Sequence, residues 1–237
     1  MLKIDNFSYS YIKNKEVIHD LNIKIENGEI LGFIGPNGAG KTTTIKSMVG
    51  INHIDVGDIT LNNISVKNNP LKYKKLIAYV PDEPLLYENL TGIQYLNFIS
   101  DMFLISEKKR QERITKYAKL FDMYQYLGNL ISSYSHGMKQ KLVLISAFIH
   151  DPKLYVLDEP FASLDPESSF KLKKILKEEA EKGKIIFFST HVLEVAEKTS
   201  TSVALIKDGK IVINEKLNKV LKNKSLEDLF METVKDE

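Results

Sequence analysis

Apolar and polar positions follow two different periods along the first 150 residues. Residues 1–81 contain short apolar runs typical of β-strands, separated by turn signals such as "NG", "VGD" and "NNP". One helix is expected to follow Lys41. Residues 85–150 instead place apolar residues at steps of three and four, and the clearest series is Ile114, Tyr117, Ala118 and Phe121. We therefore expect a mixed sheet first and a helical subdomain after it.

The last third of the chain returns to strands. The apolar runs "LYVLDEP", "KIIFFSTH" and "SVALIKDGKIVI" alternate with a charged helical segment, which predicts a parallel sheet covered on both faces. The pair Asp208-Gly209 is a strong hairpin signal. Residues 216–237 predict two short amphipathic helices, with Ser225 and Asp228 as a cap. We expect this tail to pack on its own domain rather than to form a dimer or regulatory surface.

Composition excludes several classes of function. The chain has 237 residues with 33 basic and 31 acidic side chains, and this even balance supplies no basic field for nucleic acid. The absence of cysteine excludes disulfides, thiolate metal sites and cysteine nucleophiles. The start "MLKIDNFSYS" lacks the apolar region of a secretion signal, and no apolar run approaches the roughly 20 residues that span a bilayer. A role at a membrane therefore requires another chain.

The stretch "GPNGAGKTTT" follows the apolar run "EILGFI" and fits the phosphate-loop spacing G-x-x-x-x-G-K-S/T. Glycines there let backbone N–H groups turn towards an anion, and the following helix adds its positive end. The lysine would reach the β- and γ-phosphates, and the next threonine would offer its hydroxyl to Mg²⁺. The alternative is a glycine-rich turn that merely starts a helix. The predicted nucleotide-binding residues are Gly35, Asn37, Gly38, Ala39, Gly40, Lys41, Thr42 and Thr43.

Polar residues at the ends of two later apolar runs suggest how the nucleotide is used. Asp158 and Glu159 end one run, where one carboxylate can hold Mg²⁺ and the next can orient or deprotonate an attacking water. His191 ends another run, at the sheet edge where ligands of α/β folds gather, and can donate to a γ-phosphate. The alternatives are a solvent-facing acidic strand end and a histidine bonded to backbone.

The stretch "YSHGMKQKL" resembles the signature sequence of ATP-binding cassette (ABC) ATPases, and it lies between the phosphate loop and the acid pair as in that family. "SLD" at Ser163 to Asp165 and His191 extend the resemblance to essentially the whole chain. It implies an α/β fold with a P-loop core, a mixed or parallel sheet flanked by helices, an antiparallel N-terminal part and an inserted helical subdomain. The implied division of the single domain 1–237 is a core of 1–84 and 151–215, a helical subdomain of 85–150 and a tail of 216–237.

The resemblance also implies an activity and partners. An ATPase of this family uses ATP and Mg²⁺, with Glu159, His191 and Lys41 as the expected catalytic residues. Two cassettes, as a homodimer or a pseudo-dimer with a related cassette, would close head to tail, with Ser135 and Gly137 of one on the ATP of the other. A separate integral membrane transporter subunit would hold the pair on the cytoplasmic side of the membrane. The form of the signature is similar to exporter-type and Ecs-type members.

Two further roles depend on the resemblance. An aromatic ring of "FSYSY", best matched by Tyr11 rather than Phe7 or Tyr9, would stack on adenine; the alternative is an aromatic strand packed on the sheet. Asp165 would lie at the subunit boundary and help align Glu159, or would simply cap a helix.

The sequence departs from the commonest family pattern at the signature and in the loop after residue 81. His136 stands at a usual glycine and Met138 at a usual glutamine. Asp82 stands where a metal-contacting glutamine is common, and we expect it to keep a role at the metal. The segment Asp82 to Glu88 is expected to meet the membrane subunit through its apolar side chains, or to pack beneath the helical subdomain. These side chains are Leu85, Leu86 and Tyr87.

Two other classes of function compete with transport. A soluble cassette ATPase of translation or DNA maintenance would carry two cassettes or long coiled coils, and this chain has neither. A silent regulatory nucleotide-binding module would not need Lys41, Asp158, Glu159 and His191 together. The transported cargo is expected to be recognised by the membrane chain.

Overall fold

The computed structural model describes residues 1–12, 15–222 and 225–235, and its strands form two sheets. The antiparallel sheet has the order β2-β1-β4-β5, with β1 (Leu2–Ile12), β2 (Lys15–Ile25), β4 (Val56–Leu61) and β5 (Ile64–Ser65). The second sheet has the order β10-β9-β3-β8-β7-β6 and is parallel except for β10. Its strands are β3 (Ile30–Ile34), β6 (Ile77–Val80), β7 (Leu154–Leu157), β8 (Ile185–Thr190), β9 (Ser202–Lys207) and β10 (Lys210–Lys216).

The α/β fold with an antiparallel N-terminal part, implied by the family resemblance, is confirmed, but the mixed sheet that the local pattern predicts over residues 1–81 is wrong. β3 and β6 leave this block and join the parallel sheet, whereas the other four strands pair with one another. The reason lies in burial: β3 is buried at every position, as a strand covered on both faces must be, while β2 and β4 interleave buried and more exposed residues. The hairpin at Asp208-Gly209 is confirmed, with φ angles of 47° and 73° that a two-residue turn requires.

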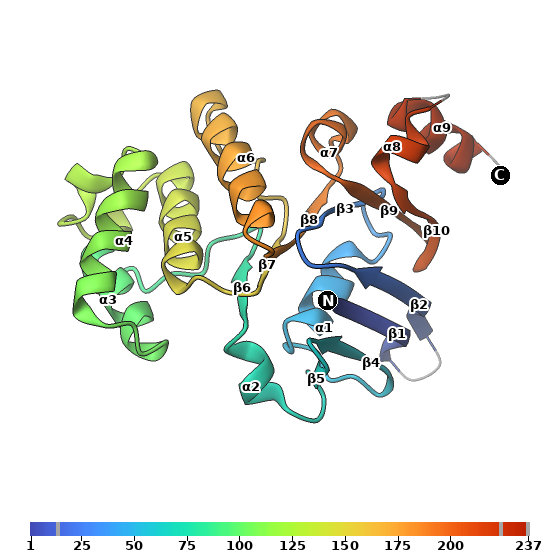
Figure 1. Cartoon of the computed structure of the whole chain (residues 1–237), viewed down its shortest axis with the longest axis horizontal. Coiled ribbons are helices and arrows are strands. Elements are labelled where there is room, and N and C mark those ends of the chain that lie inside the picture. The colour runs from blue at the N-terminus through green and yellow to red at the C-terminus, as the bar shows by residue number, and fades with distance from the viewer. Residues whose placement is uncertain (13–14, 223–224, 236–237) are drawn as a thin grey trace.

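Helices cover both faces of the parallel sheet (Figure 1). α1 (Lys41–Met48) packs between the two sheets, while α5 (His136–His150) and α6 (Pro166–Glu181) lie on the opposite face. The remaining helices of the core and tail are α2 (Pro70–Lys74), α7 (Leu193–Thr199), α8 (Leu217–Val220) and α9 (Leu226–Lys235). Within the described ranges, no helix is long and apolar enough to cross a membrane.

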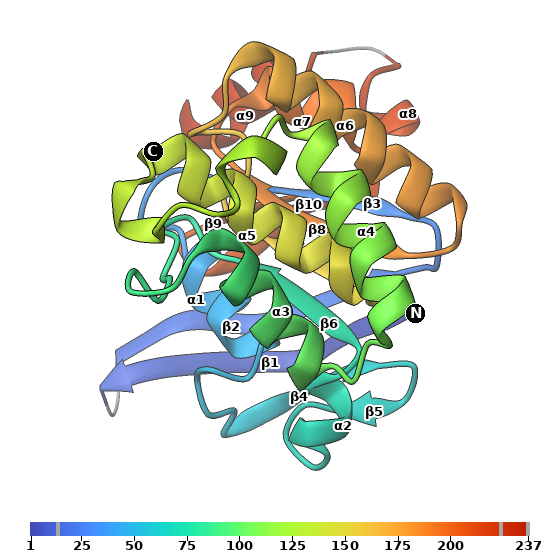
Figure 2. The ribbon, with the colours of Figure 1, turned by 90° about the vertical axis from the view of Figure 1, so that its left-hand side faces the viewer.

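The helical block stands at one end of the sheet, with its helices facing the viewer in Figure 2. It consists of α3 (Gly92–Met102), α4 (Glu107–Leu120) and α5, with short 3₁₀ turns at Tyr124–Tyr126 and Ile131–Ser133. The predicted apolar series of α4 faces inwards, and all four of its members are buried: Ile114, Tyr117, Ala118 and Phe121.

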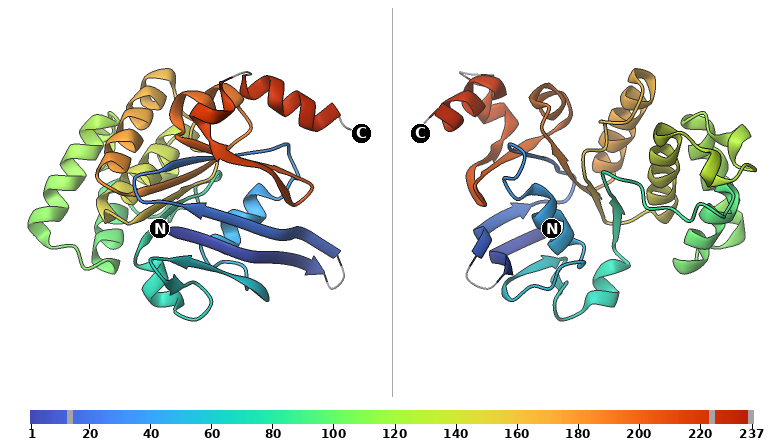
Figure 3. Two further views of the ribbon diagram at one scale, coloured as in Figure 1. Left: turned by 45° about the vertical axis from the view of Figure 1, so that its right-hand side comes forward. Right: turned by 180° about the vertical axis from the view of Figure 1, so that it is seen from behind.

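The C-terminal tail packs on its own domain, above the β9 end of the sheet (Figure 3). Leu217 and Leu226 join a buried cluster with Val203 and Leu205. The predicted cap is present, since the Ser225 backbone N–H donates to Asp228 and the Asp228 N–H donates to the Ser225 hydroxyl, each at 3.1 Å. Residues 223, 224, 236 and 237 of this tail lie outside the described residues.

Phe148 connects the helical block to the sheet. It is 1% exposed, and its ring centroid lies 5.3 Å from those of both Tyr117 in α4 and Tyr155 in β7. Phe148→Ala is expected to lower the free energy of unfolding by about 3–5 kcal/mol, because it leaves a cavity among aromatic side chains. Urea denaturation followed by circular dichroism measures this change.

Phe170 provides the matched control, since it is 70% exposed on α6. Phe170→Ala is expected to change the same free energy by less than about 0.5 kcal/mol. A comparably small effect of Phe148→Ala would show that the helical block does not depend on this contact.

Candidate active site

Polar residues follow the carboxyl ends of four strands of the parallel sheet. β3 leads into the loop Gly35 to Gly40, β6 into Asp82, β7 into Asp158, and β8 into His191. Because these strands run parallel, their carboxyl ends meet at the same side of the sheet. The candidate residues predicted from separate stretches of sequence therefore gather at one place.

The loop after β3 requires glycine for reasons of space and backbone angle. A Cβ on Gly35 would lie 2.3 Å from the Ile206 carbonyl oxygen. Gly40 has a φ of 105°, which an L side chain rarely adopts, and its added Cβ would lie 2.4 Å from Ile18. Of the other loop residues, Asn37 is exposed and Ala39 is buried. The loop thus packs against β9 of the parallel sheet at its start and against β2 of the antiparallel sheet at its end.

Lys41 opens α1 and is 8% exposed. Its ammonium group donates hydrogen bonds to the carbonyl oxygens of Gly35 at 2.8 Å and Pro36 at 3.1 Å. Burial lowers the pKa of Lys41, and the negative charges of Glu159 and Asp158 oppose this effect. The ammonium group therefore lies inside the loop, close to both carboxylates.

An exposed aromatic ring stands beside the start of α1. Tyr11 is 58% exposed, and its hydroxyl lies 3.1 Å from the Thr43 hydroxyl in hydrogen-bond contact. Tyr9 meets this ring edge-on, with centroids 4.9 Å apart, whereas Phe7 is fully buried in the core. Tyr11 alone of these three aromatic residues presents most of its side chain to solvent near the loop.

Asp158 is buried at the end of β7, with 2% of its surface exposed. Its carboxylate accepts a hydrogen bond of 2.6 Å from the Ser189 hydroxyl and another from Thr42. Burial raises the pKa of Asp158, hydrogen bonding from Ser189 opposes that rise, and the charge of Asp82 adds to it. The site thus holds a carboxylate whose ionised form a cation would stabilise.

Glu159 is positioned by its backbone and by His191. Its φ of 46° is unusual for a residue other than glycine, and its N–H donates to the Ser189 hydroxyl at 3.0 Å. Its carboxylate lies 2.9 Å from His191 Nδ1. The strained turn and the histidine together hold the glutamate side chain at the sheet edge.

Ser189 is a site residue that sequence reasoning missed. Its hydroxyl donates to Asp158 and accepts from the Glu159 backbone, so that one side chain fixes both acids. The available signal was a polar residue in the apolar run "KIIFFSTH", two positions before His191. A hydroxyl that is fully buried in a central strand needs partners, and here those partners are the two acids.

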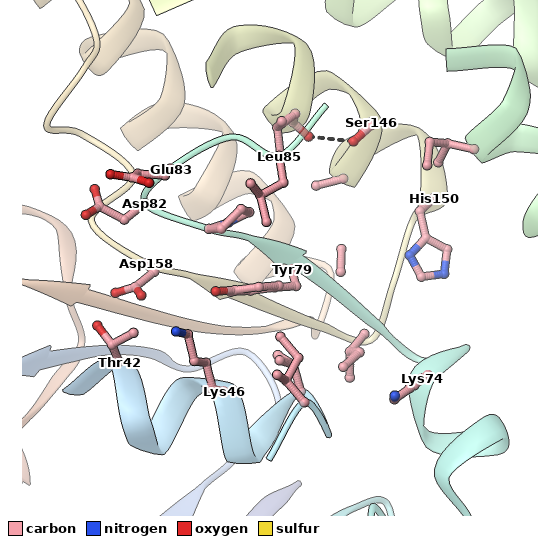
Figure 4. Close-up of a pocket in the computed structure, with 18 of the residues that line it drawn as sticks. Thr42, Lys46, Lys74, Tyr79, Asp82, Glu83, Leu85, Ser146, His150 and Asp158 are labelled. Atoms are coloured by element: carbon pink, nitrogen blue, oxygen red, sulfur yellow. Dashed lines mark hydrogen bonds between the residues drawn. The ribbon is translucent and has the colours of Figure 1, made fainter. Parts of the chain in front are cut away.

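Asp82 shares a cavity of about 730 Å³ with Thr42 and Asp158 (Figure 4). Burial raises the pKa of Asp82, and the nearby carboxylates of Glu159 and Glu83 raise it further. Thr42 and the carboxylates provide the oxygen donors that Mg²⁺ prefers. In the described part of the chain, no three His, Asp or Glu side chains form a metal-binding group on their own. Thr42, Asp82 and Asp158 therefore fit an ion that also keeps water and phosphate oxygens as ligands.

The signature residues lie at the start of α5, outside this cavity. Ser135 is exposed, and its hydroxyl accepts from the Met138 backbone N–H at 3.3 Å as the helix cap. Gly137 follows in the first turn, where an added Cβ would lie 3.1 Å from the Ser163 carbonyl oxygen. Among the described residues, no hydrogen bond joins Ser135 or Gly137 to the phosphate loop.

Asp165 caps α6 and also forms an ion pair. Its carboxylate accepts from the Ser168 N–H at 2.8 Å and lies 2.8 Å from the Lys141 ammonium. These hydrogen bonds hold the pKa of Asp165 well below its ordinary value. Capping is thus one of its roles in the single chain.

Comparison with known proteins agrees with this geometry. The family model described as ABC transporter matches residues 18–162. The ABC-type transporter ATP-binding protein EcsA of Bacillus subtilis is 31% identical over 100% of this chain and 98% of its own length. The SkfA peptide export ATP-binding protein SkfE of the same species is 35% identical over 90% of this chain and 87% of its own.

A solved structure of the ATP binding subunit of an ABC transporter superimposes with a TM-score of 0.95. It is 32% identical, and the match covers 99% of this chain and 100% of that one. Both the length of the match and the edge of the sheet described above point to one conclusion: the chain belongs to the ABC transporter family and is an ATP-hydrolysing cassette of that family.

Proposed function

We propose that the chain hydrolyses ATP as one of two paired cassettes and that this reaction drives a separate membrane-spanning subunit. The observation that carries the proposal is the 2.9 Å contact between Glu159 and His191, beside a phosphate loop that already encloses Lys41. A bound triphosphate would lie between the loop and this pair. Residues 85–150 would then act as the arm that presents the signature to the second cassette.

Binding would depend mainly on the loop and on Lys41. The backbone N–H groups of Gly38 and Gly40 and the start of α1 favour an anion, and the Lys41 ammonium can exchange its carbonyl partners for phosphate oxygens. Tyr11 offers its exposed ring to the base. Stacking of this kind gives affinity without strong selection among bases.

Hydrolysis requires a water to be deprotonated as it attacks the γ-phosphate. Glu159 is the base in this scheme, because its side chain is partly exposed while that of Asp158 is buried and hydrogen-bonded to Ser189. His191 holds the Glu159 carboxylate in place and can donate to the γ-phosphate when the nucleotide arrives. Ser189 keeps the backbone of Glu159 in its strained conformation.

Mg²⁺ would be held by Thr42 and Asp158, with Asp82 acting directly or through water. When bound, the ion supplies positive charge that offsets the negative charge on the phosphates. The raised pKa values of Asp158 and Asp82 are consistent with this assignment, because crowded carboxylates gain from a nearby cation.

The second cassette would complete the site. Ser135 is exposed at the start of α5, where the backbone N–H groups of a helix N-terminus favour an anion. A head-to-tail pair, either two copies of this chain or this chain with a related cassette, would bring this helix start to the γ-phosphate of the other subunit. Loss of the γ-phosphate would then release the pair, which is how hydrolysis could change the state of a membrane partner.

The membrane subunit would dock at the cavity beside Asp82. Leu85 lines this cavity and is 87% exposed. Tyr87, two positions further on, is 61% exposed, and its ring meets Phe98 of α3 edge-on at 5.7 Å. Such an exposed apolar group beside a cavity suits an inserted helix of a partner. This arrangement would place the cassette at the cytoplasmic face of a membrane. Export is the proposed direction, by analogy with the relative named for peptide export.

Replacing Glu159 tests the pairing and the chemistry together. Glu159→Gln is expected to retain ATP binding, to lower the hydrolysis rate at least about 100-fold and to accumulate an ATP-dependent dimer, because the base is lost while the phosphate contacts remain. Size-exclusion chromatography with light scattering reports the dimer. Glu167→Gln is the control, since Glu167 is 74% exposed on α6. A variant that stays monomeric with ATP and Mg²⁺, alone and with any membrane component, would exclude the pairing.

Replacing Asp82 tests the metal assignment. Asp82→Ala is expected to raise the Mg²⁺ concentration for half-maximal ATPase activity by roughly tenfold, because a partner of the ion is lost. Glu83→Ala removes an equal charge from the same cavity. It is expected to change the Mg²⁺ concentration for half-maximal activity by less than about twofold. An ATPase rate and Mg²⁺ dependence unaltered by Asp82→Ala would remove this role.

Co-expression with the neighbouring open reading frames tests the membrane partner. A multi-spanning membrane chain is expected to copurify with the tagged cassette. Leu85→Asp should reduce the recovered membrane chain at least about tenfold, because a carboxylate replaces an apolar contact. Phe170→Asp, which changes an exposed aromatic residue on α6, should leave recovery unchanged. Equal recovery of the membrane chain with both variants would show that it docks elsewhere on the cassette.

A further inference from the structure

A side-chain hydrogen bond connects the signature to the loop that follows the acid pair. His136 Nε2 and the Ser163 hydroxyl lie 2.8 Å apart, although 27 positions separate the two residues in the chain. His136 is the first residue of α5, directly after Ser135. A glycine at this position could not form the bond, because it has no side chain. The departure from the commonest signature therefore adds a contact that the usual sequence lacks.

Two further contacts join the same surfaces. The Gly137 backbone packs so closely on Ser163 that an added Cβ would lie 3.1 Å from the Ser163 carbonyl oxygen. One turn further along α5, the Lys141 ammonium pairs with Asp165 at 2.8 Å. The start of α5 thus holds this loop on both sides of Leu164.

The loop from Glu159 to Asp165 is short and anchored at its beginning. The Ala162 N–H donates to the Glu159 carbonyl at 3.2 Å, and the Phe161 ring meets the buried Phe188 ring edge-on at 5.8 Å. Because the segment between Glu159 and Ser163 is short and held by these contacts, a displacement at Ser163 alters the turn that carries Glu159. This turn already holds Glu159 at a φ of 46°.

His136 is not needed to cap its own helix. The Ser135 hydroxyl already accepts the Met138 N–H, and the His136 side chain points to another segment of the chain. Capping of α5, which would be the simplest structural role for His136, is therefore already performed by Ser135. The remaining role for His136 is to hold the signature against the segment from Glu159 to Asp165.

We propose that His136 is a positioning residue that couples the signature at Ser135 to the base Glu159 of the same chain through its hydrogen bond to Ser163. The inference rests on the proposed function, in which Ser135 meets the ATP of the partner cassette. Engagement of one ATP at Ser135 would then hold Glu159 in its working orientation at the other ATP. His136 acts through Ser163 and touches neither nucleotide nor water in this scheme.

The test is a double-mutant cycle on ATP hydrolysis by the full chain. His136→Ala and Ser163→Ala are each expected to lower kcat about 3- to 10-fold, the range of one neutral hydrogen bond, and to leave the KM for ATP unchanged. The double variant should be no slower than either single variant, because both remove the same bond. His136→Gln, which keeps a side-chain donor, should recover part of the rate.

Ser133→Ala is the matched control. Ser133 lies two positions before the signature serine, and its hydroxyl donates locally, to the Leu130 carbonyl at 2.7 Å. Its kcat should equal that of the parent chain. Thermal melts accompany each variant, and if His136→Ala unfolds, Ser163→Ala and His136→Gln still decide the outcome. A parental kcat in these variants, or additive losses in the cycle, would overturn the coupling.

A second measurement separates this inference from the proposed function. In the Glu159→Gln background, ATP should still produce a dimer when His136 is replaced by alanine, since the phosphate contacts of Ser135 remain. Failure of Glu159→Gln itself to dimerise with ATP would count against the paired cassettes. Normal dimerisation combined with an additive cycle would remove the role of His136 alone.

Discussion

The parallel pairing of β3, β7 and β8 is the constraint on which the site depends. β8 lies between the other two strands, so that Ser189 reaches Asp158 on one side while the phosphate loop extends from β3 on the other. A slip in this register would separate the lysine of the loop from the acids. The burial of all three strands fixes the register, because a displaced strand would expose apolar residues.

Negative charge is concentrated at this edge of the sheet. Asp82, Glu83, Asp158 and Glu159 lie near one another, with Lys41 the cation that offsets the last two. Burial and mutual repulsion raise the pKa values of Asp82 and Asp158, which means that part of the folding free energy is lost when both ionise. A cation bound among these carboxylates would therefore stabilise the folded chain.

Local sequence was enough to place the glycine-rich loop, the acid pair and His191 at the ends of strands, because each follows an apolar run, and the structure has them there. The helical block was also predictable from its period. The local pattern did not separate the strands of residues 1–81 into two sheets, although the family resemblance implied an antiparallel N-terminal part. The bridge made by Ser189 and the bond between His136 and Ser163 escaped prediction, because both join distant segments. Local sequence does not determine which strands pair with each other. It also does not identify the hydrogen-bond partner of a single serine or histidine.

The position of Lys41 has a consequence for selectivity. Its ammonium group donates hydrogen bonds to two carbonyl oxygens of its own loop, so an arriving anion competes with these bonds. A small monoanion offers too little charge to compensate for that exchange, whereas a polyphosphate offers several oxygens at once. The loop therefore discriminates by the number of negative charges that a ligand presents, before any contact with its base or sugar is made.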